Sequence, residues 1–152
     1  MNNVLIKVRR LDPAAVTPVY SSDGAMCFDL HACLTDGVGA LSINPGESAI
    51  VPTGLAFELP TGWGLDVFAR SGLARDGLSL GNGVGKIDPD YRGELGILLH
   101  NRRSETPFVI RHGDRIAQAA PVQIVRATFE EVSQLSDTER GAGGFGSTGV
   151  AA

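Results

Sequence analysis

Residues 70–74 form the first of three glycine-containing segments whose residue types could bind phosphate or activate water. They are Arg70, Ser71, Gly72, a leucine and an alanine, placed where a strand would lead into a short helix. A serine cap at such a start leaves backbone N–H groups free to point at one anion, and Arg70 adds a charge-assisted contact. The segment predicts a phosphate-binding turn, and an ordinary helix cap beside a surface arginine is the alternative.

Residues 81–94 hold the densest group of candidate residues. Three glycines alternate in residues 81–85, so that the backbone could lie against a flat ligand. Asn82 can both donate and accept hydrogen bonds, as reading an amide-like edge requires. Asp88 precedes a proline that restrains its backbone, and its carboxylate could take a proton from water. Tyr91 offers a flat face to a sugar or base. A plain hairpin with a structural aspartate remains the alternative.

Residues 140–149 contain five glycines together with an arginine, a phenylalanine, a serine and a threonine. Flexible linkers seldom carry an aromatic residue and a leading arginine. Backbone N–H groups, hydroxyls and a guanidinium bind phosphate, and one aromatic ring can stack on a base. The segment is therefore interpreted as an arm that closes over a substrate, with a solvated tail as the alternative.

The elements that must position these residues are short strands. The chain has 152 residues with 20 Gly and 8 Pro, so 28 positions, about 18%, interrupt regular structure, against roughly 12% in ordinary proteins. This excludes a helix bundle and predicts an all-β sandwich or barrel. Turns with proline and glycine separate the strands expected between residues 42 and 69. Further strands are expected at residues 4–8, 94–100, 108–110, 116–122 and 127–132, and one short helix after Ser71, through residues 73–75.

Charge and hydropathy exclude several classes of partner. The net charge of −4 provides no field for nucleic acid or an anionic membrane, and no apolar run approaches about 18 residues. The N-terminus lacks the layout of a signal peptide, so a cytoplasmic protein is expected. Cys27 and Cys33 are expected on one face of a strand with Asp29. Their sulfurs would lie roughly 20 Å apart, too far for one disulfide or one zinc ion, so reduced cysteines are predicted.

Taken together, these segments resemble the all-β dUTP diphosphatase (dUTPase) family. Five motifs occur in the family's order, at residues 29–30, 70–74, 85–93, 113–118 and 140–149. The resemblance implies a jelly-roll-like β-sandwich or barrel (the β-clip) with one short helix and a flexible glycine-rich C-terminal arm. Residues 1–139 would form the β domain and residues 140–152 the mobile arm. It also implies a homotrimer with active sites shared between subunits, each closed by an arm.

The resemblance further implies hydrolysis of dUTP to dUMP and pyrophosphate, with a role for each matching residue. Asp88 would activate the water that attacks the α-phosphorus. Tyr91 would lie under the deoxyribose. Uracil would be read by Asn82, by the backbone of Lys86, Ile87 and Asp88, and by Gly96. The phosphates would be held by Arg70, Ser71, Gly72 and Gln118. The arm would contribute Arg140, Gly146, Ser147 and Thr148, with Phe145 covering the base.

A magnesium ion is implied by the same resemblance. The triphosphate and waters would hold Mg²⁺, with Asp29 acting only through water, which suits a hard cation that keeps its hydration shell. Met26 and Cys27 stand where the family usually has alanine and glycine, and these bulkier residues could shift the outer shell of the metal.

Two further departures bring in a related activity. Ala69 replaces the usual proline, and the loop at residues 75–78 is one residue short. The shortened loop is similar to that of dCTP deaminases, which share the fold. A deaminase needs a catalytic glutamate at the position of Leu98, however, and leucine moves no proton. A deaminase or bifunctional enzyme, and a non-catalytic nucleotide-binding trimer, are the alternatives.

Overall fold

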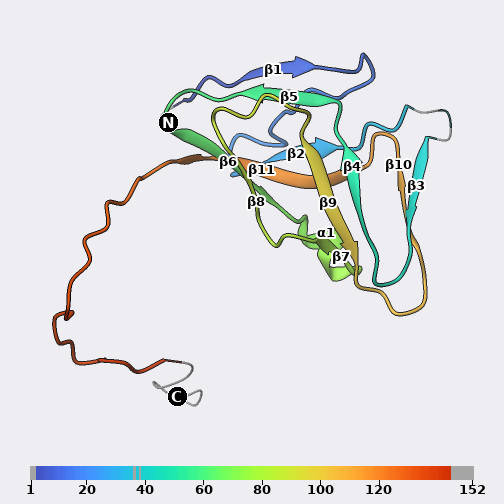
Figure 1. The fold of residues 1–152 in the computed structure, drawn as a ribbon. Coiled ribbons are helices and arrows are strands. Elements are labelled where there is room, and N and C mark those ends of the chain that lie inside the picture. The colour runs from blue at the N-terminus through green and yellow to red at the C-terminus, as the bar shows by residue number, and fades with distance from the viewer. Residues whose placement is uncertain (1–2, 36, 38, 145–152) are drawn as a thin grey trace.

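The computed structural model describes residues 3–35, 37 and 39–144. In this part of the chain, strands account for nearly all the regular structure (Figure 1). The strands are β1 (Lys7–Arg10), β2 (Phe28–His31), β3 (Ala40–Ile43), β4 (Ser48–Pro52), β5 (Leu55–Glu58), β6 (Trp63–Phe68), β7 (Leu78–Leu80), β8 (Gly85–Ile87), β9 (Gly96–Asn101), β10 (Phe108–Arg111) and β11 (Arg115–Gln123). One short helix, α1 (Ser71–Arg75), follows β6.

The strands form four antiparallel sheets around one core. Two sheets are pairs, β1–β5 and β3–β10, and the larger ones have the orders β2–β11–β6–β8 and β4–β9–β7. Buried residues from all four sheets make a single hydrophobic cluster, which includes Leu30, Leu55, Leu65, Leu99 and Ile110. Among the described residues no sheet closes into a barrel. The all-β fold and its sandwich form are thus confirmed. No helix in these parts of the chain is long and apolar enough to cross a membrane.

Alternation along the strands decides which side chains face outward. In β2, Phe28 and Leu30 are buried, whereas Asp29 and His31 are half-buried on the opposite face. Asp29 lies directly across from Gln118 of β11, and Gln118 lies across from Phe68 of β6. Residues opposite one another in an antiparallel pair point to the same face. The sheet therefore holds Asp29 and Gln118 side by side on its outer face.

Helix α1 lies where it was expected, but it begins one residue earlier and has another cap. Ser71 is the first helical residue rather than the cap, and Arg70 takes the cap position with extended backbone angles (φ −79, ψ 133). No side chain caps the helix, because the guanidinium of Arg70 has no acceptor to offer the free helix N–H groups and donates to Asp29 instead. The prediction of a serine cap was wrong.

The strand expected at residues 127–132 is also absent. Residues 124–144 contain neither helix nor strand, and they leave the body of the domain as a long extended segment (Figure 1). The amide of Ile124 still donates to the carbonyl of Gly62 over 2.8 Å. Beyond it Val125, Phe129 and Leu135 are 91%, 96% and 86% exposed. A strand needs a partner for its backbone groups, and none of the described strands of this chain lies alongside.

Both cysteines are free, and they do not share a face. Cys27 is half-buried, whereas Cys33 is buried in the core cluster. The expected alternation fails because β2 ends at His31, after which the amide of Cys33 turns to the carbonyl of Pro52 (2.8 Å). Burial raises the pKa of the Cys33 thiol, so the thiol stays protonated at neutral pH.

Candidate functional site

Four of the five residues predicted to read a base line one hollow between β8 and β9. Asn82, Lys86, Ile87 and Gly96 all contribute to its wall, above the buried Val67. The space at Gly85 is tight, since a Cβ at this position would stand 3.1 Å from Cβ of Val67 and one of the two would have to shift. The glycine lets the backbone of β8 pack closely against β6, which leaves the edge of β8 bordering the hollow.

A neighbouring cavity contains the proposed catalytic carboxylate. Asp88 and Tyr91 line a cavity of about 210 Å³ together with Lys86, Ile87 and Gly96. Because the last three also border the base-reading hollow, the two spaces adjoin. The structure thus brings Asp88 and Tyr91 close to the residues predicted to read the base, and their roles stay predictions.

The turn that carries Asp88 and Tyr91 is fixed by its own hydrogen bonds. The amide of Tyr91 donates to the carbonyl of Asp88 (3.2 Å), and the tyrosine hydroxyl donates to the carbonyl of Glu94 (2.9 Å). Arg92 donates to the carbonyl of Pro89 over 2.6 Å. A Cβ on Gly93 would collide with the ring of Tyr91. The ring is therefore held over the turn with its hydroxyl already engaged.

Lys86 has a partner that sequence reasoning missed. Its ammonium lies 2.7 Å from both carboxylate oxygens of Asp66, the residue directly opposite on β6. The ion pair braces β8, an edge strand of only three residues that leads into Asp88. The signal was an aspartate and a lysine on neighbouring strands, and it becomes visible only once the pairing register is known.

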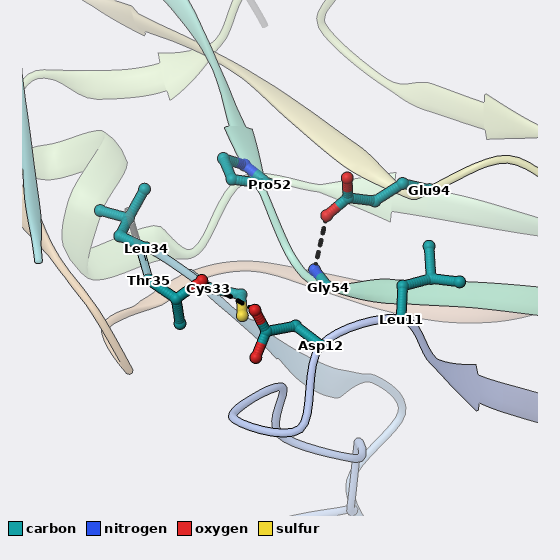
Figure 2. Close-up of a pocket in the computed structure, with 8 residues that line it drawn as sticks. All are labelled: Leu11, Asp12, Cys33, Leu34, Thr35, Pro52, Gly54 and Glu94. Carbon is teal, nitrogen blue, oxygen red and sulfur yellow. Dashed lines mark hydrogen bonds between the residues drawn. The ribbon is translucent and has the colours of Figure 1, made fainter. Parts of the chain in front are cut away.

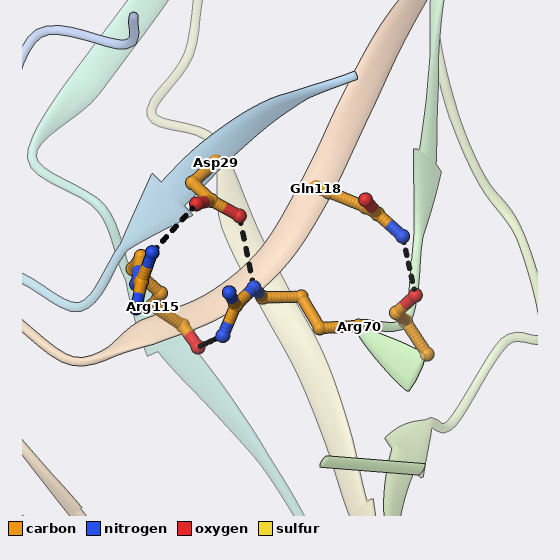
Figure 3. Close-up of polar contacts among 5 residues, drawn as sticks. Asp29, Arg70, Arg115 and Gln118 are labelled. Carbon is orange, nitrogen blue, oxygen red and sulfur yellow. Dashed lines mark hydrogen bonds and ion pairs between the residues drawn. The ribbon is translucent and has the colours of Figure 1, made fainter. Parts of the chain in front are cut away.

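A second group of polar residues gathers around Asp29 (Figure 3). Nε of Arg70 donates to Oδ1 of Asp29 over 2.8 Å, and Arg115 lies 3.4 Å from Oδ2. Gln118 donates to the carbonyl of Ala69 over 3.0 Å, which ties β11 to the residue before Arg70. The structure thus brings Asp29, Arg70 and Gln118 together, and it adds Arg115 from the motif at residues 113–118.

The cluster around Asp29 carries a net positive charge. Asp29 has 18% of its side chain exposed, and it faces two guanidinium groups. The arginines carry one positive charge more than Asp29 neutralises. Burial lowers the pKa of the neighbouring His31, whose Nδ1 is enclosed without a hydrogen-bond partner among the described residues. His31 is accordingly neutral at neutral pH, so it adds no charge to the cluster of Asp29 and the two arginines.

Asp29 and β8 belong to opposite edges of the same sheet. The order β2–β11–β6–β8 separates them by three strand spacings, about 14 Å at about 4.8 Å each. No hydrogen bond joins the Asp29 cluster to the Asp88 turn within the described ranges. One copy of the chain therefore holds the residues predicted to read a base and those predicted to bind phosphate at separate places.

The remaining predicted residues belong to the C-terminal segment. Arg140 is exposed, and its Nε donates to the carbonyl of Gly143 (2.9 Å). Phe145, Gly146, Ser147 and Thr148 lie outside the described residues. Met26, which replaces a small residue of the first motif, is 82% exposed, so its side chain points to solvent.

Another cavity, of about 320 Å³, holds none of the predicted residues (Figure 2). Asp12, Cys33, Gly54 and Glu94 are among those that line it. Its polar groups are already engaged with the protein: Asp12 accepts from Thr35 (2.7 Å), and Glu94 accepts from the amide of Gly54 (2.7 Å). Its polar lining therefore serves the packing of the turn before β5.

Comparison with known proteins decides the family. The model of the dUTPase family matches residues 14–149. A deoxyuridine 5'-triphosphate nucleotidohydrolase of Desulfitobacterium hafniense is 49% identical over 154 residues, covering 99% of both chains. The chain belongs to the dUTPase family. A second relative in the family, from Nautilia profundicola, is 46% identical and covers 95% of this chain and 98% of its own.

Solved dUTPase structures share the fold. A mutant dUTPase of Staphylococcus bacteriophage 80alpha with dUpNHpp superposes with a TM-score of 0.82 at 25% identity, covering 96% of this chain and 99% of its own. A mutant dUTPase of phage phi11, described with a structural Mg(II) ion, gives a TM-score of 0.75 at 22% identity over 88% of this chain and 99% of its own. The second likeness supports the dUTPase fold alone.

Proposed function

We propose that this dUTPase hydrolyses dUTP to dUMP and pyrophosphate, with Asp88 activating the attacking water. The observation that carries the proposal is the adjacency of the base-reading hollow and the cavity that contains Asp88 and Tyr91. A base held by Asn82 and the backbone of β8 would set its sugar against Tyr91. The first phosphate would then lie near Asp88.

The chemical step is an in-line displacement at the α-phosphorus. The carboxylate of Asp88 accepts a proton from water as the water oxygen bonds to phosphorus. The bond between that phosphorus and the bridging oxygen breaks, and pyrophosphate leaves with the electron pair. Charge that develops on the phosphate oxygens is stabilised by Arg70, by the amides of Ser71 and Gly72, and by Gln118.

Magnesium fits this chain through the nucleotide rather than through protein ligands. The described residues contain no group of three His, Cys, Asp or Glu side chains placed to hold a metal. The carboxylate of Asp29 already accepts from Arg70, so a contact through water suits it better than direct coordination. A bound Mg²⁺ would neutralise triphosphate charge and orient the phosphates.

The active unit in this proposal is a homotrimer in the cytoplasm. The separation of the two half-sites in one chain supports sites shared between copies, each site combining the base-reading half of one copy with the phosphate-binding half of another. Residues 124–144 support it too, since they carry exposed Val125, Phe129 and Leu135 away from their own domain. Apolar side chains this exposed gain by packing on another copy. Residues 140–152 would then act as the arm that closes a site.

A nucleotide panel tests the activity. We expect Mg²⁺-dependent pyrophosphate release from dUTP, with dCTP, dTTP and UTP as poor substrates, and the assay scores pyrophosphate and ammonia separately. Ammonia from dCTP would contradict the proposal in favour of a deaminase. Binding of dUTP without either product would instead indicate a binding module.

A further inference from the structure

Helix α1 is too short to fix its own direction. It has five residues, no fully buried side chain and no side-chain cap, and helices of this length are unstable alone. Leu73 is only partly buried where it packs on the core. The orientation of α1 must therefore come from contacts at its ends, and its first residues are the proposed phosphate-binding Ser71 and Gly72.

The far end of α1 is held by Arg103, from the loop between β9 and β10. Nε of Arg103 donates to the carbonyl of Asp76, just beyond the helix, over 2.7 Å. Its guanidinium carbon lies 4.4 Å from the ring centroid of Phe108, so the group is stacked as well as hydrogen-bonded. The amide of Arg102 donates to the carbonyl of Gly77 over 2.8 Å. The loop thus grips the end of α1 at consecutive carbonyls.

Gly77 makes room for this grip. Its φ of +95 lies in the left-handed region, and a Cβ there would stand 2.8 Å from Cγ of Arg103. The stem of the arginine occupies the space that a side chain at residue 77 would fill. The glycine at position 77 and the arginine at position 103 are therefore complementary parts of the same contact.

The backbone of Arg103 is itself held in place by the buried side chain of Asn101. Its amide donates to the side-chain oxygen of Asn101 over 3.0 Å, and Asn101 is fully buried. The side-chain nitrogen of Asn101 donates to the carbonyls of Ile43 (2.9 Å) and Thr106 (3.0 Å). The hydrogen bonds run from the core through Asn101 and Arg103 to the carbonyl of Asp76, with no water needed as a bridge.

We propose that Arg103 is a positioning residue for the phosphate-binding segment 70–72, an inference that rests on the proposed function. In this structure the guanidinium of Arg70 is paired with Asp29, so a phosphate must redirect that side chain. During the exchange the start of α1 depends on the contact at its far end. Five residues rise about 8 Å, so a tilt of about 10° at Asp76 moves Ser71 by more than 1 Å. Shifts of this size reduce catalysis strongly.

The experiment compares ligands with and without phosphates in the full-length enzyme. The variants are Arg103→Ala and Arg103→Lys, and Arg111→Ala removes an exposed arginine from the following strand as the matched control. Binding of dUpNHpp with Mg²⁺ and of deoxyuridine is measured by calorimetry, together with kcat and KM for dUTP. For Arg103→Ala we expect affinity for dUpNHpp to fall about tenfold and affinity for deoxyuridine to change less than twofold.

The conservative variant separates charge from geometry. Lysine keeps the charge but has no planar fork to stack on Phe108 while donating to Asp76, so Arg103→Lys should recover less than half of the lost affinity on a logarithmic scale. Recovery to the wild-type value would overturn the geometric argument. Arg111→Ala should match wild type for both ligands.

Two results would overturn the proposal while the wild type still hydrolyses dUTP. Equal losses for dUpNHpp and deoxyuridine would show general damage, and unchanged dUpNHpp affinity would show that segment 70–72 is positioned without Arg103. Wild-type protein that releases no pyrophosphate from dUTP would contradict the proposed function itself. Should Arg103→Ala fail to fold, Arg103→Lys and Phe108→Leu, which removes the stacking surface, provide the same comparison.

Discussion

Replacing Gly54 with alanine tests whether the core near the turn before β5 is as tightly packed as the structure shows. Gly54 has φ +67, and a Cβ there would stand 2.8 Å from Cβ of Ala15 and 2.9 Å from Sγ of Cys33. The left-handed backbone costs alanine about 1–2 kcal/mol, and overpacking a well-packed core costs about 1–3 kcal/mol more. We expect Gly54→Ala to lower the free energy of unfolding by about 2–5 kcal/mol.

Gly62→Ala is the matched control. Its φ of +84 carries the same backbone strain, but nothing lies within 4 Å of the added Cβ. It should lose only about 1–2 kcal/mol. The difference between the two variants isolates the packing contribution, because the left-handed backbone is common to both.

The assay is equilibrium urea unfolding at one fixed protein concentration, since assembly would couple stability to concentration. Adding Cys33→Ala to Gly54→Ala removes the sulfur that the new methyl group meets. The double-mutant cycle should then show a favourable coupling of at least about 0.5 kcal/mol. Equal losses for Gly54→Ala and Gly62→Ala, or no coupling with Cys33→Ala, would refute the packing argument.

Three further outcomes are expected. Asp88→Asn should bind dUpNHpp much as wild type does but turn over dUTP at least about 100-fold more slowly in steady-state kinetics, and unchanged turnover would remove Asp88 as the base. After deletion of residues 140–152, light scattering should still give the mass of a trimer, while most dUTP turnover is lost. Dissociation of the trimer would show instead that the segment is structural. Burial lowers the pKa of His31 below its usual 6.5, so the unfolded state binds more protons and stability should fall as the pH drops below about 6.5. His31→Gln should flatten this part of the pH profile in urea titrations, and an unaltered profile would assign the dependence to other groups.

Local rules were enough to predict the kind of fold and most of the turns. Glycine and proline spacing predicted short strands, and the helix at residues 71–75 followed from its sequence. The prediction of a strand at residues 127–132 was wrong. Alternating apolar and polar side chains show that a segment could be a strand, but they do not show whether another strand lies alongside to pair with it. The prediction that Cys33 shares a face with Cys27 was wrong for a related reason, because side chains alternate between the two faces only while the strand continues.

Contacts between residues far apart in the chain could not be predicted from the sequence. The Asp66–Lys86 ion pair depends on the register of β6 against β8, and the contact of Arg103 with Asp76 spans two loops far apart in the chain. By contrast Asp29, Arg70 and Gln118 were predicted as candidates one motif at a time, and the sheet order explains why they meet. Residue types in a motif indicate which chemistry a side chain can perform, whereas the fold topology determines which other side chains it contacts.

The extended course of residues 124–144 has a consequence for trimers that mix two different inactive chains. If the arm of one chain closes a site built from the other two, a defect in the arm and a defect at Asp88 fall in different sites of a mixed trimer. Two inactive proteins, one lacking residues 140–152 and one carrying Asp88→Asn, could then complement each other after being unfolded and refolded together. Some of the mixed trimers would contain an intact site assembled from undamaged parts, so that part of the activity would return in the mixture.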